Sequence, residues 1–201
     1  MYMNFFSFCQ KDEENDCVSA FLPEDIDISS VQLIEENGMY FLPVNFVLKR
    51  LSVDENGLNV SSNLTGIQNL WPDNLNNDMA WPLFSERLKS IIATTLTGKE
   101  QLKWLVCSVV LNEESRKYYL PIFHSKFDIL DETRCIYDDY GCIIKYVYSS
   151  LKVQPYSIFP EPDYNNWWEI SPVLYVSEVL KKAIQKAKLT GLVMEKATVI
   201  R

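Results

Sequence analysis

The chain has 201 residues, of which 47% are hydrophobic and 23% charged, and its formal net charge is −8. A chain of this length and composition can bury enough apolar surface to fold as one domain, or two small ones, without disulfides or structural metals. The acidic balance argues against nucleic-acid binding, because affinity for phosphates comes from clustered Lys and Arg.

The negative charge is concentrated in the first half of the chain. Residues 1–100 contain 15 Asp and Glu against 6 Lys and Arg, whereas residues 101–201 are nearly neutral. Two interpretations stay open: a solvated acidic loop, or an acidic face that attracts a basic partner, since a field of one sign speeds association. The N-terminal candidates for such a face are Asp12, Glu13, Glu14, Asp16, Glu24, Asp25 and Asp27.

The first quarter of the chain predicts strands. Residues 1–9 form the first candidate, and a short one follows at 31–34. Asn37-Gly38 is a strong turn signal, after which the apolar segment 39–48 predicts a strand or a short helix. Residues 59–80 are rich in Asn and predict irregular surface chain.

The first helix is predicted over about 85–97. Ser85 can cap it by accepting free N–H groups of the first turn, and Gly98 can end it. The apolar residues between them recur at helical spacing, so one face is expected to be buried.

Strand patterns return after the first helix. Residues 102–111 and 118–123 flank a polar turn and predict a hairpin, and β-branched and aromatic residues over 142–148 predict a further strand. A second helix is predicted over about 177–189, and residues 192–200 are expected to return as a strand.

These elements predict an α+β fold with a mostly antiparallel sheet and two main amphipathic helices. We expect one compact domain in which an acidic strand and loop region, residues 1–75, packs on the region 76–201.

The chain lacks the sequence signals of a metal or cofactor site. It has five cysteines, none spaced as C-x-x-C, and a single histidine, His124, so we expect no zinc site. Its six glycines form no phosphate-binding loop, and we expect no cofactor. The odd cysteine count fits a reducing compartment.

No sequence signal points to export or to a membrane. The N-terminus has no basic region before its short apolar stretch, which argues against a signal peptide. No apolar stretch approaches the roughly 20 residues of a membrane span. We therefore expect a cytoplasmic protein.

Two further groups of residues are candidates for chemistry or binding. The densest carboxylates of the second half could form a metal or acid–base site; they are Asp128, Asp131, Glu132, Asp138 and Asp139. Asp128 and Asp131 would fall on opposite faces of a strand, which argues against convergence. The adjacent Trp167 and Trp168, with other aromatic residues nearby in the sequence, could form a platform for a ligand, cover the core or anchor an interface.

Three segments, taken in order, resemble a known bacterial family. They are residues 81–92 (WPLFSERLKSII), 118–131 (YYLPIFHSKFDILD) and 174–194 (LYVSEVLKKAIQKAKLTGLVM). Over about residues 75–195 the chain is similar to immunity proteins of bacterial polymorphic-toxin systems, in particular immunity family eleven. The resemblance implies a non-enzymatic inhibitor that binds a cognate toxin and blocks its active site.

The partner implied by this resemblance is a toxin protein, and a basic nuclease-type domain is one candidate because acidic immunity proteins oppose such toxins. Besides the N-terminal acidic residues, the candidate contact residues are Asp138, Asp139, Trp167 and Trp168. Two alternatives stay open: a scaffold that self-associates through its aromatic residues, and an enzyme that uses the carboxylates of residues 128–139.

Overall fold

The structure is a computed structural model that describes residues 4–10, 16–55, 57–124, 127–161, 170–197 and 199–200. Strands make up 45% of it and helices 15%, so the expected α+β class is confirmed in its broad form. The described residues contain three α-helices rather than two, namely α1 (Glu86–Thr95), α2 (Ser150–Val153) and α3 (Glu178–Lys186).

The largest sheet closes into a small barrel. Its strands are β2 (Asp16–Phe21), β6 (Asn74–Asn77), β7 (Leu83–Phe84), β9 (Glu114–Phe123), β8 (Leu102–Leu111) and β4 (Met39–Asp54), in that spatial order. A further pairing of β2 with β4 closes the ring. The β2–β6 and β4–β8 pairs are parallel, so the prediction of a mostly antiparallel sheet is only partly right.

The β8–β9 hairpin separates two hydrophobic cores, because successive side chains of a strand point to opposite faces. On β8, Leu105, Cys107 and Val109 point into the barrel core. Leu102 and Trp104 belong instead to the cluster on the outer face, beneath the helices. Burial raises the pKa of the Cys107 thiol, which therefore acts as a small core hydrophobe.

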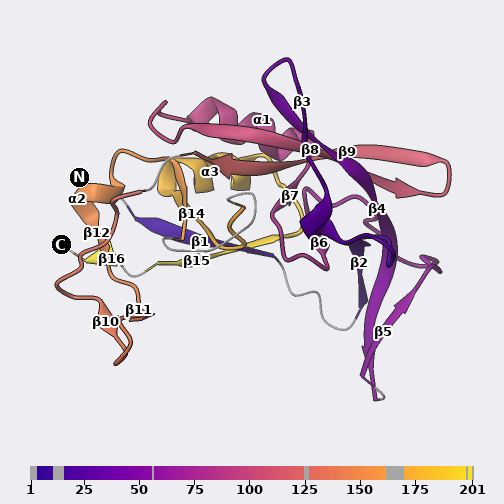
Figure 1. Cartoon of the computed structure of the whole chain (residues 1–201), viewed down its shortest axis with the longest axis horizontal. Helices are drawn as coiled ribbons and strands as arrows, with labels where there is room; N and C mark the ends of the chain where they lie inside the picture. The colour runs from indigo at the N-terminus through magenta and orange to yellow at the C-terminus, as the bar shows by residue number, and fades with distance from the viewer. Residues whose placement is uncertain are drawn as a thin grey trace.

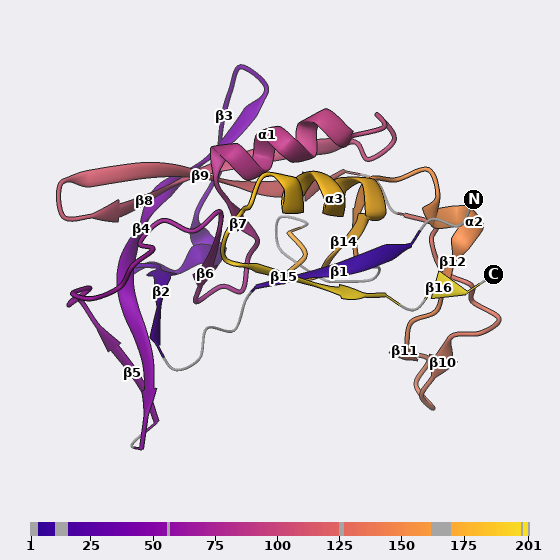
Figure 2. The same ribbon diagram turned by 180° about the vertical axis from the view of Figure 1, so that it is seen from behind.

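A second layer lies against the outer face of the barrel (Figures 1 and 2). Its antiparallel sheet runs in the order β13 (Ile158–Pro160), β14 (Leu174–Ser177), β1 (Phe5–Gln10) and β15 (Leu192–Lys196). Helix α3 packs on β14 and β1 of this sheet, α1 packs on β7 and β9 of the barrel, and the two helices pack on each other. Together they bury Leu88, Ile92, Leu180 and Ile184.

The helix starts are where the sequence predicts them. The hydroxyls of Ser85 and Ser177 accept the backbone N–H groups of Leu88 and Leu180, respectively, and cap α1 and α3. Both helices are shorter at their C-terminal ends than predicted, since α1 ends at Thr95 and α3 at Lys186.

Most of the remaining elements lie at the two ends of the molecule (Figures 1 and 2). At one end, α2 and the parallel pair of β12 (Tyr148–Ser149) and β16 (Val199–Ile200) adjoin the hairpin of β10 (Ile136–Tyr137) and β11 (Ile143–Lys145). At the other end, β5 (Gly57–Ser61) pairs with the end of β4, whereas β3 (Ile34–Glu36) pairs with the start of β4 and projects from the middle of the molecule. The short 3-10 helix η1 (Ile28–Ser30) lies between β2 and β3 in the chain.

Residues 59–80 contain more regular secondary structure than the sequence predicts. They contain the end of β5 and the whole of β6, in which the side chains of Asn76 and Asn77 find partners. The buried Asn77 amide donates to the carbonyl of Trp81 and accepts the N–H groups of Met79 and Trp81. These bonds satisfy backbone N–H and C=O groups of the loop, which would otherwise need water as their hydrogen-bond partner.

A buried carboxylate joins the barrel to the helical layer. Asp73, just before β6, accepts the Ser85 hydroxyl at 2.6 Å and the Thr190 N–H at 3.0 Å. Arg87 of α1 forms an ion pair with the same carboxylate and donates to the carbonyl of Ala187 after α3. Asp73 therefore fixes the start of α1 and the end of α3 against β6.

A second buried carboxylate, Glu100, holds the other end of α1. Its side chain is 1% exposed and accepts the backbone N–H of Ser157 at 2.8 Å and that of Thr97 at 3.0 Å. The Thr97 hydroxyl also donates to it. Glu100 therefore ties the loop after α1 to the loop before β13.

Replacing Glu100 with glutamine is expected to lower the free energy of unfolding by about 2 kcal/mol, because the amide group would turn a donor toward buried N–H donors. Chemical denaturation measures the loss. The exposed Glu113 at the β8–β9 turn supplies the control, and Glu113→Gln is expected to stay within about 0.5 kcal/mol of the parent protein. Equal losses in the two variants would contradict the role given to Glu100.

Candidate protein-binding surface

Five of the candidate contact residues lie outside the described residues. They are Asp12, Glu13, Glu14, Trp167 and Trp168. The remaining six candidates are described and fall at two separate places in the fold, so each can be examined for what its side chain contacts.

Two of the N-terminal acidic residues have local structural partners. Asp16 on β2 forms an ion pair with Arg50 on β4, and the hydrogen bond from Arg50 lowers the pKa of the Asp16 carboxyl. Asp27 caps η1 by accepting the hydroxyl and the N–H of Ser29, and these bonds lower its pKa. Both carboxylates are therefore engaged within the fold.

The other two described acidic residues of this region are open to solvent. Glu24 and Asp25 are exposed in the loop between β2 and η1. Within the described part of the chain, neither side chain has an ion pair or a hydrogen-bond partner. They fit either the solvated-loop or the acidic-face interpretation.

Asp138 and Asp139 lie at the turn of the β10–β11 hairpin. The Asp138 carboxylate accepts the backbone N–H groups of Tyr140 at 2.9 Å and Cys142 at 2.8 Å, and so organises the turn. Gly141, with φ of +83°, takes the left-handed conformation that this turn requires. Asp139 is exposed beside it.

The same hairpin exposes large apolar side chains. Tyr140 is 93% exposed at its tip, and Ile144 is 67% exposed on β11. Ile136 and Tyr137 of β10 are exposed as well. We call residues 136–145 the acidic hairpin, because its turn carries the carboxylates of Asp138 and Asp139. Exposed aromatic side chains in a group are typical of binding surfaces.

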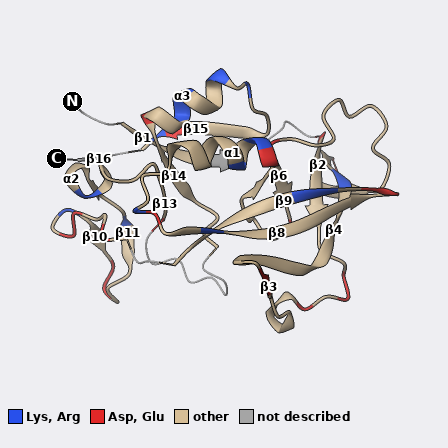
Figure 3. Ribbon diagram, turned by 90° about the horizontal axis from the view of Figure 1, so that it is seen from above, with Lys and Arg blue, Asp and Glu red and all other residues tan. Residues whose placement is uncertain are grey.

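The two acidic regions do not form one face. Asp16 belongs to β2, and the acidic hairpin lies at the opposite end of the molecule in all three ribbon views (Figures 1, 2 and 3). A partner of ordinary size that covers the acidic hairpin would therefore not reach β2 through the same contact.

Three of the five carboxylates of residues 128–139 have separate partners, and Glu132 and Asp139 are exposed. Asp128 pairs with Lys152 at 2.7 Å, and Asp131 accepts the Thr133 hydroxyl at 2.6 Å. Asp138 is held by its own turn. Across the part of the chain that the structure describes, no group of three or more His, Cys, Asp or Glu side chains is placed to hold a metal ion.

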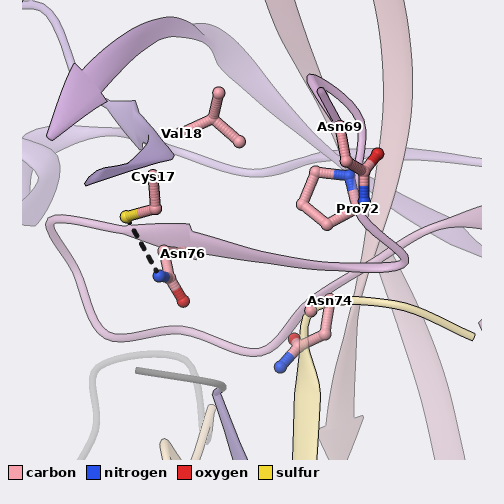
Figure 4. Close-up of a pocket in the computed structure, with 7 residues that line it drawn as sticks. Cys17, Val18, Asn69, Pro72, Asn74 and Asn76 are labelled. Carbon is pink, nitrogen blue, oxygen red and sulfur yellow. Dashed lines mark hydrogen bonds between the residues drawn. The ribbon is translucent and has the colours of Figure 1, made fainter. Parts of the chain in front are cut away.

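A small cavity lies beside β2 and β6 (Figure 4). Its lining includes Cys17, Asn74 and Asn76, and the Asn76 amide donates to the Cys17 sulfur at 3.7 Å. The buried Asn74 Oδ1 has no hydrogen-bond partner among the described residues. The cavity volume of about 10 Å³ suits one water molecule and is too small for an organic ligand.

A second exposed apolar surface was not predicted from the sequence. Strand β5 pairs with the end of β4 in a hairpin that projects from the barrel (Figures 1 and 2). We call residues 50–54 of β4 together with β5 the projecting arm. Leu58 on this arm is 68% exposed, and Val53 and Val60 are also exposed. The alternation of Leu58, Asn59 and Val60 beside an Asn-Gly turn is the sequence signal that could have revealed it.

Comparison of the chain with models of known protein families gives no match. A search of curated proteins also gives no match. In the described residues, no helix is both long enough and apolar enough to cross a membrane.

Proposed function

We propose that this protein is an immunity protein, which binds a cognate bacterial toxin and neutralises it without catalysis. The resemblance of residues 81–92, 118–131 and 174–194 to the immunity family supports the proposal. The structural observation that carries it is the acidic hairpin, in which Tyr140 is 93% exposed next to Asp138 and Asp139. An aromatic side chain beside carboxylates suits contact with a basic protein surface.

The acidic hairpin is organised before any partner binds. Its turn is held by two backbone N–H groups on the Asp138 carboxylate and by the Gly141 N–H on the Asp138 carbonyl at 3.1 Å. A fixed turn loses little conformational entropy on binding, so more of the contact energy of Tyr140 contributes to affinity.

The proposed mode of inhibition is occlusion. A toxin that acts on a polyanion needs a positively charged cleft, because its substrate is recognised through phosphates. The acidic hairpin offers carboxylates and a protruding aromatic ring to such a cleft, and the rigid body behind it would exclude the substrate. The proposed partner is therefore a basic toxin domain of the nuclease type.

The test is co-expression of the full chain with each toxin domain encoded beside its gene. We expect one of these domains to be lethal alone, to be tolerated with the immunity protein, and to copurify with it. If no neighbouring domain gives either protection or a complex, the proposed function is wrong.

A variant at Tyr140 tests whether the toxin binds to the acidic hairpin. Tyr140→Ala is expected to weaken the toxin complex by about 30-fold, because an exposed aromatic at the centre of an interface contributes about 2 kcal/mol. Isothermal titration calorimetry with the copurified toxin domain measures the change. Val179 on α3 is also an exposed apolar side chain, and Val179→Ala is the matched control. Unchanged affinity in Tyr140→Ala would move the contact away from the hairpin.

A further inference from the structure

The acidic hairpin is a small element that needs an anchor. Its strands β10 and β11 contain two and three residues, and among the described strands they pair only with each other. Their register also shifts between Ile136 and Tyr137. A hairpin of two strands is marginally stable on its own in water, so the direction in which this one projects depends on what holds its base.

The base of the acidic hairpin is closed by a side chain. Cys135 directly precedes β10, and Val147 lies two residues after β11. The Val147 N–H donates to the Cys135 sulfur at 3.4 Å, and the Cys135 thiol donates to the Val147 carbonyl at 3.8 Å. Val147 is buried, so water is not at hand to replace the sulfur as the partner of its backbone N–H.

Val147 is itself fixed to the body of the protein. Its carbonyl also accepts the Asp131 N–H at 2.8 Å, and Leu130 and Tyr148 beside them form an antiparallel bridge. Leu130 and Tyr148 belong to a buried hydrophobic cluster, against which Cys135 is partly buried. The thiol therefore connects the first strand of the hairpin to a segment that the core holds in place.

We propose that Cys135 is a positioning residue for toxin binding, because its thiol fixes the direction in which the acidic hairpin presents Tyr140. The two paired positions of β10 and β11 hold the strands to each other but not to the body of the protein. A thiol is both a weak donor and a weak acceptor, so it serves both backbone groups of Val147 at once. This inference deepens the proposed function and rests on it for the role of Tyr140.

The first experiment needs no toxin and follows amide hydrogen exchange by NMR in the full chain. The Asp138 N–H donates to the Cys142 carbonyl at 2.9 Å and reports on opening of the hairpin. Cys135→Ala, which removes both thiol bonds, is expected to speed exchange at Asp138 about tenfold. Cys135→Ser keeps a group that can donate and accept, and exchange is expected to stay within about threefold of the parent rate.

Two controls separate a local effect from a general loss of stability. The amides of β8 in the barrel are expected to exchange at the parent rate in both variants, because the hairpin opens without the barrel. Cys142→Ala removes an exposed thiol from the same hairpin and is expected to leave exchange at Asp138 unchanged. If Cys135→Ala does not fold, Cys135→Val, which also lacks a donor and an acceptor, replaces it.

The second experiment is calorimetry with the toxin domain that copurifies with the chain. Cys135→Ala is expected to weaken the complex about fivefold, since a loosened hairpin has to be ordered on binding. Cys135→Ser is expected to restore most of the affinity, which a role in packing alone would not predict.

Three results would overturn the inference. Exchange at Asp138 could be unchanged in Cys135→Ala, or Cys135→Ser could behave as Cys135→Ala does, which would leave only packing. Toxin affinity could also be unchanged in Cys135→Ala although exchange is faster, and the direction of the hairpin would then be irrelevant to binding. Failure to find any toxin would overturn the proposed function instead, while the exchange rates would still decide whether Cys135 holds the hairpin.

Discussion

Replacing Gly191 with alanine is expected to lower the free energy of unfolding by about 4 kcal/mol. A Cβ atom at this position would lie 2.2 Å from the carbonyl oxygen of Asn74 and 2.8 Å from the Cβ of Pro72. The backbone φ of +77° adds strain of roughly 1–2 kcal/mol for any residue with a side chain. Chemical denaturation, with the free energy extrapolated to water, measures the loss.

The large effect is expected because relief of this clash has to move backbone. The Asn74 N–H donates to the Thr190 carbonyl at 3.1 Å, and Asp73 accepts the Thr190 N–H. Moving residue 191 away from β6 would therefore break the junction between the barrel and α3. Gly98 is the control, since its φ is +85° but nothing lies within 4 Å of an added Cβ. Gly98→Ala is expected to lose only about 1 kcal/mol, and an equal loss in Gly191→Ala would contradict the close approach.

Helices α1 and α3 and the central hairpin could be predicted from the sequence because their signals are local. Ser85 and Ser177 stand directly before amphipathic segments, and both are observed caps. The polar segment between residues 111 and 118 joins two apolar runs that pair as predicted, although β9 begins earlier than predicted, at Glu114. In each case the residues that specify the element lie close together in the sequence.

The barrel could not be predicted in this way, because parallel pairs join residues that are distant in the chain. Ser19 pairs with Asn76, and Tyr40 pairs with Leu105. No short-range pattern encodes such partners, and the Asn-rich composition of β6 even argues against a strand. Buried hydrogen bonds of Asn77 to the following loop override that propensity.

The candidate binding residues, too, could be predicted only in part from the sequence. The sequence identifies the acidic residues, but only the structure separates Asp16 and Asp27, which are held by Arg50 and Ser29, from the exposed Glu24 and Asp139. Charge density alone cannot show whether a carboxylate is already engaged, because the partner is chosen by tertiary packing or by a turn. The exposure of Tyr140 cannot be predicted from the sequence either, because it too depends on how the hairpin packs in the fold.

Salt is expected to weaken the steering of the toxin by the acidic hairpin. Attraction between the acidic hairpin and a basic toxin is screened by ions, so the association rate should fall at least tenfold between about 20 mM and 500 mM salt. Stopped-flow fluorescence with the toxin domain measures the association rate.

Two charge reversals identify which acidic region steers the toxin. Asp139→Lys changes the acidic hairpin, and Glu24→Lys makes the same change in the loop after β2, where the carboxylate is also exposed. If the hairpin is the contact, Asp139→Lys should lower the association rate severalfold at low salt and little at high salt, because only the long-range field is altered. Glu24→Lys should have a much smaller effect, since the two regions lie at opposite ends of the molecule. The reverse order would assign partner choice to the N-terminal acidic region and leave the hairpin without a role in recognition.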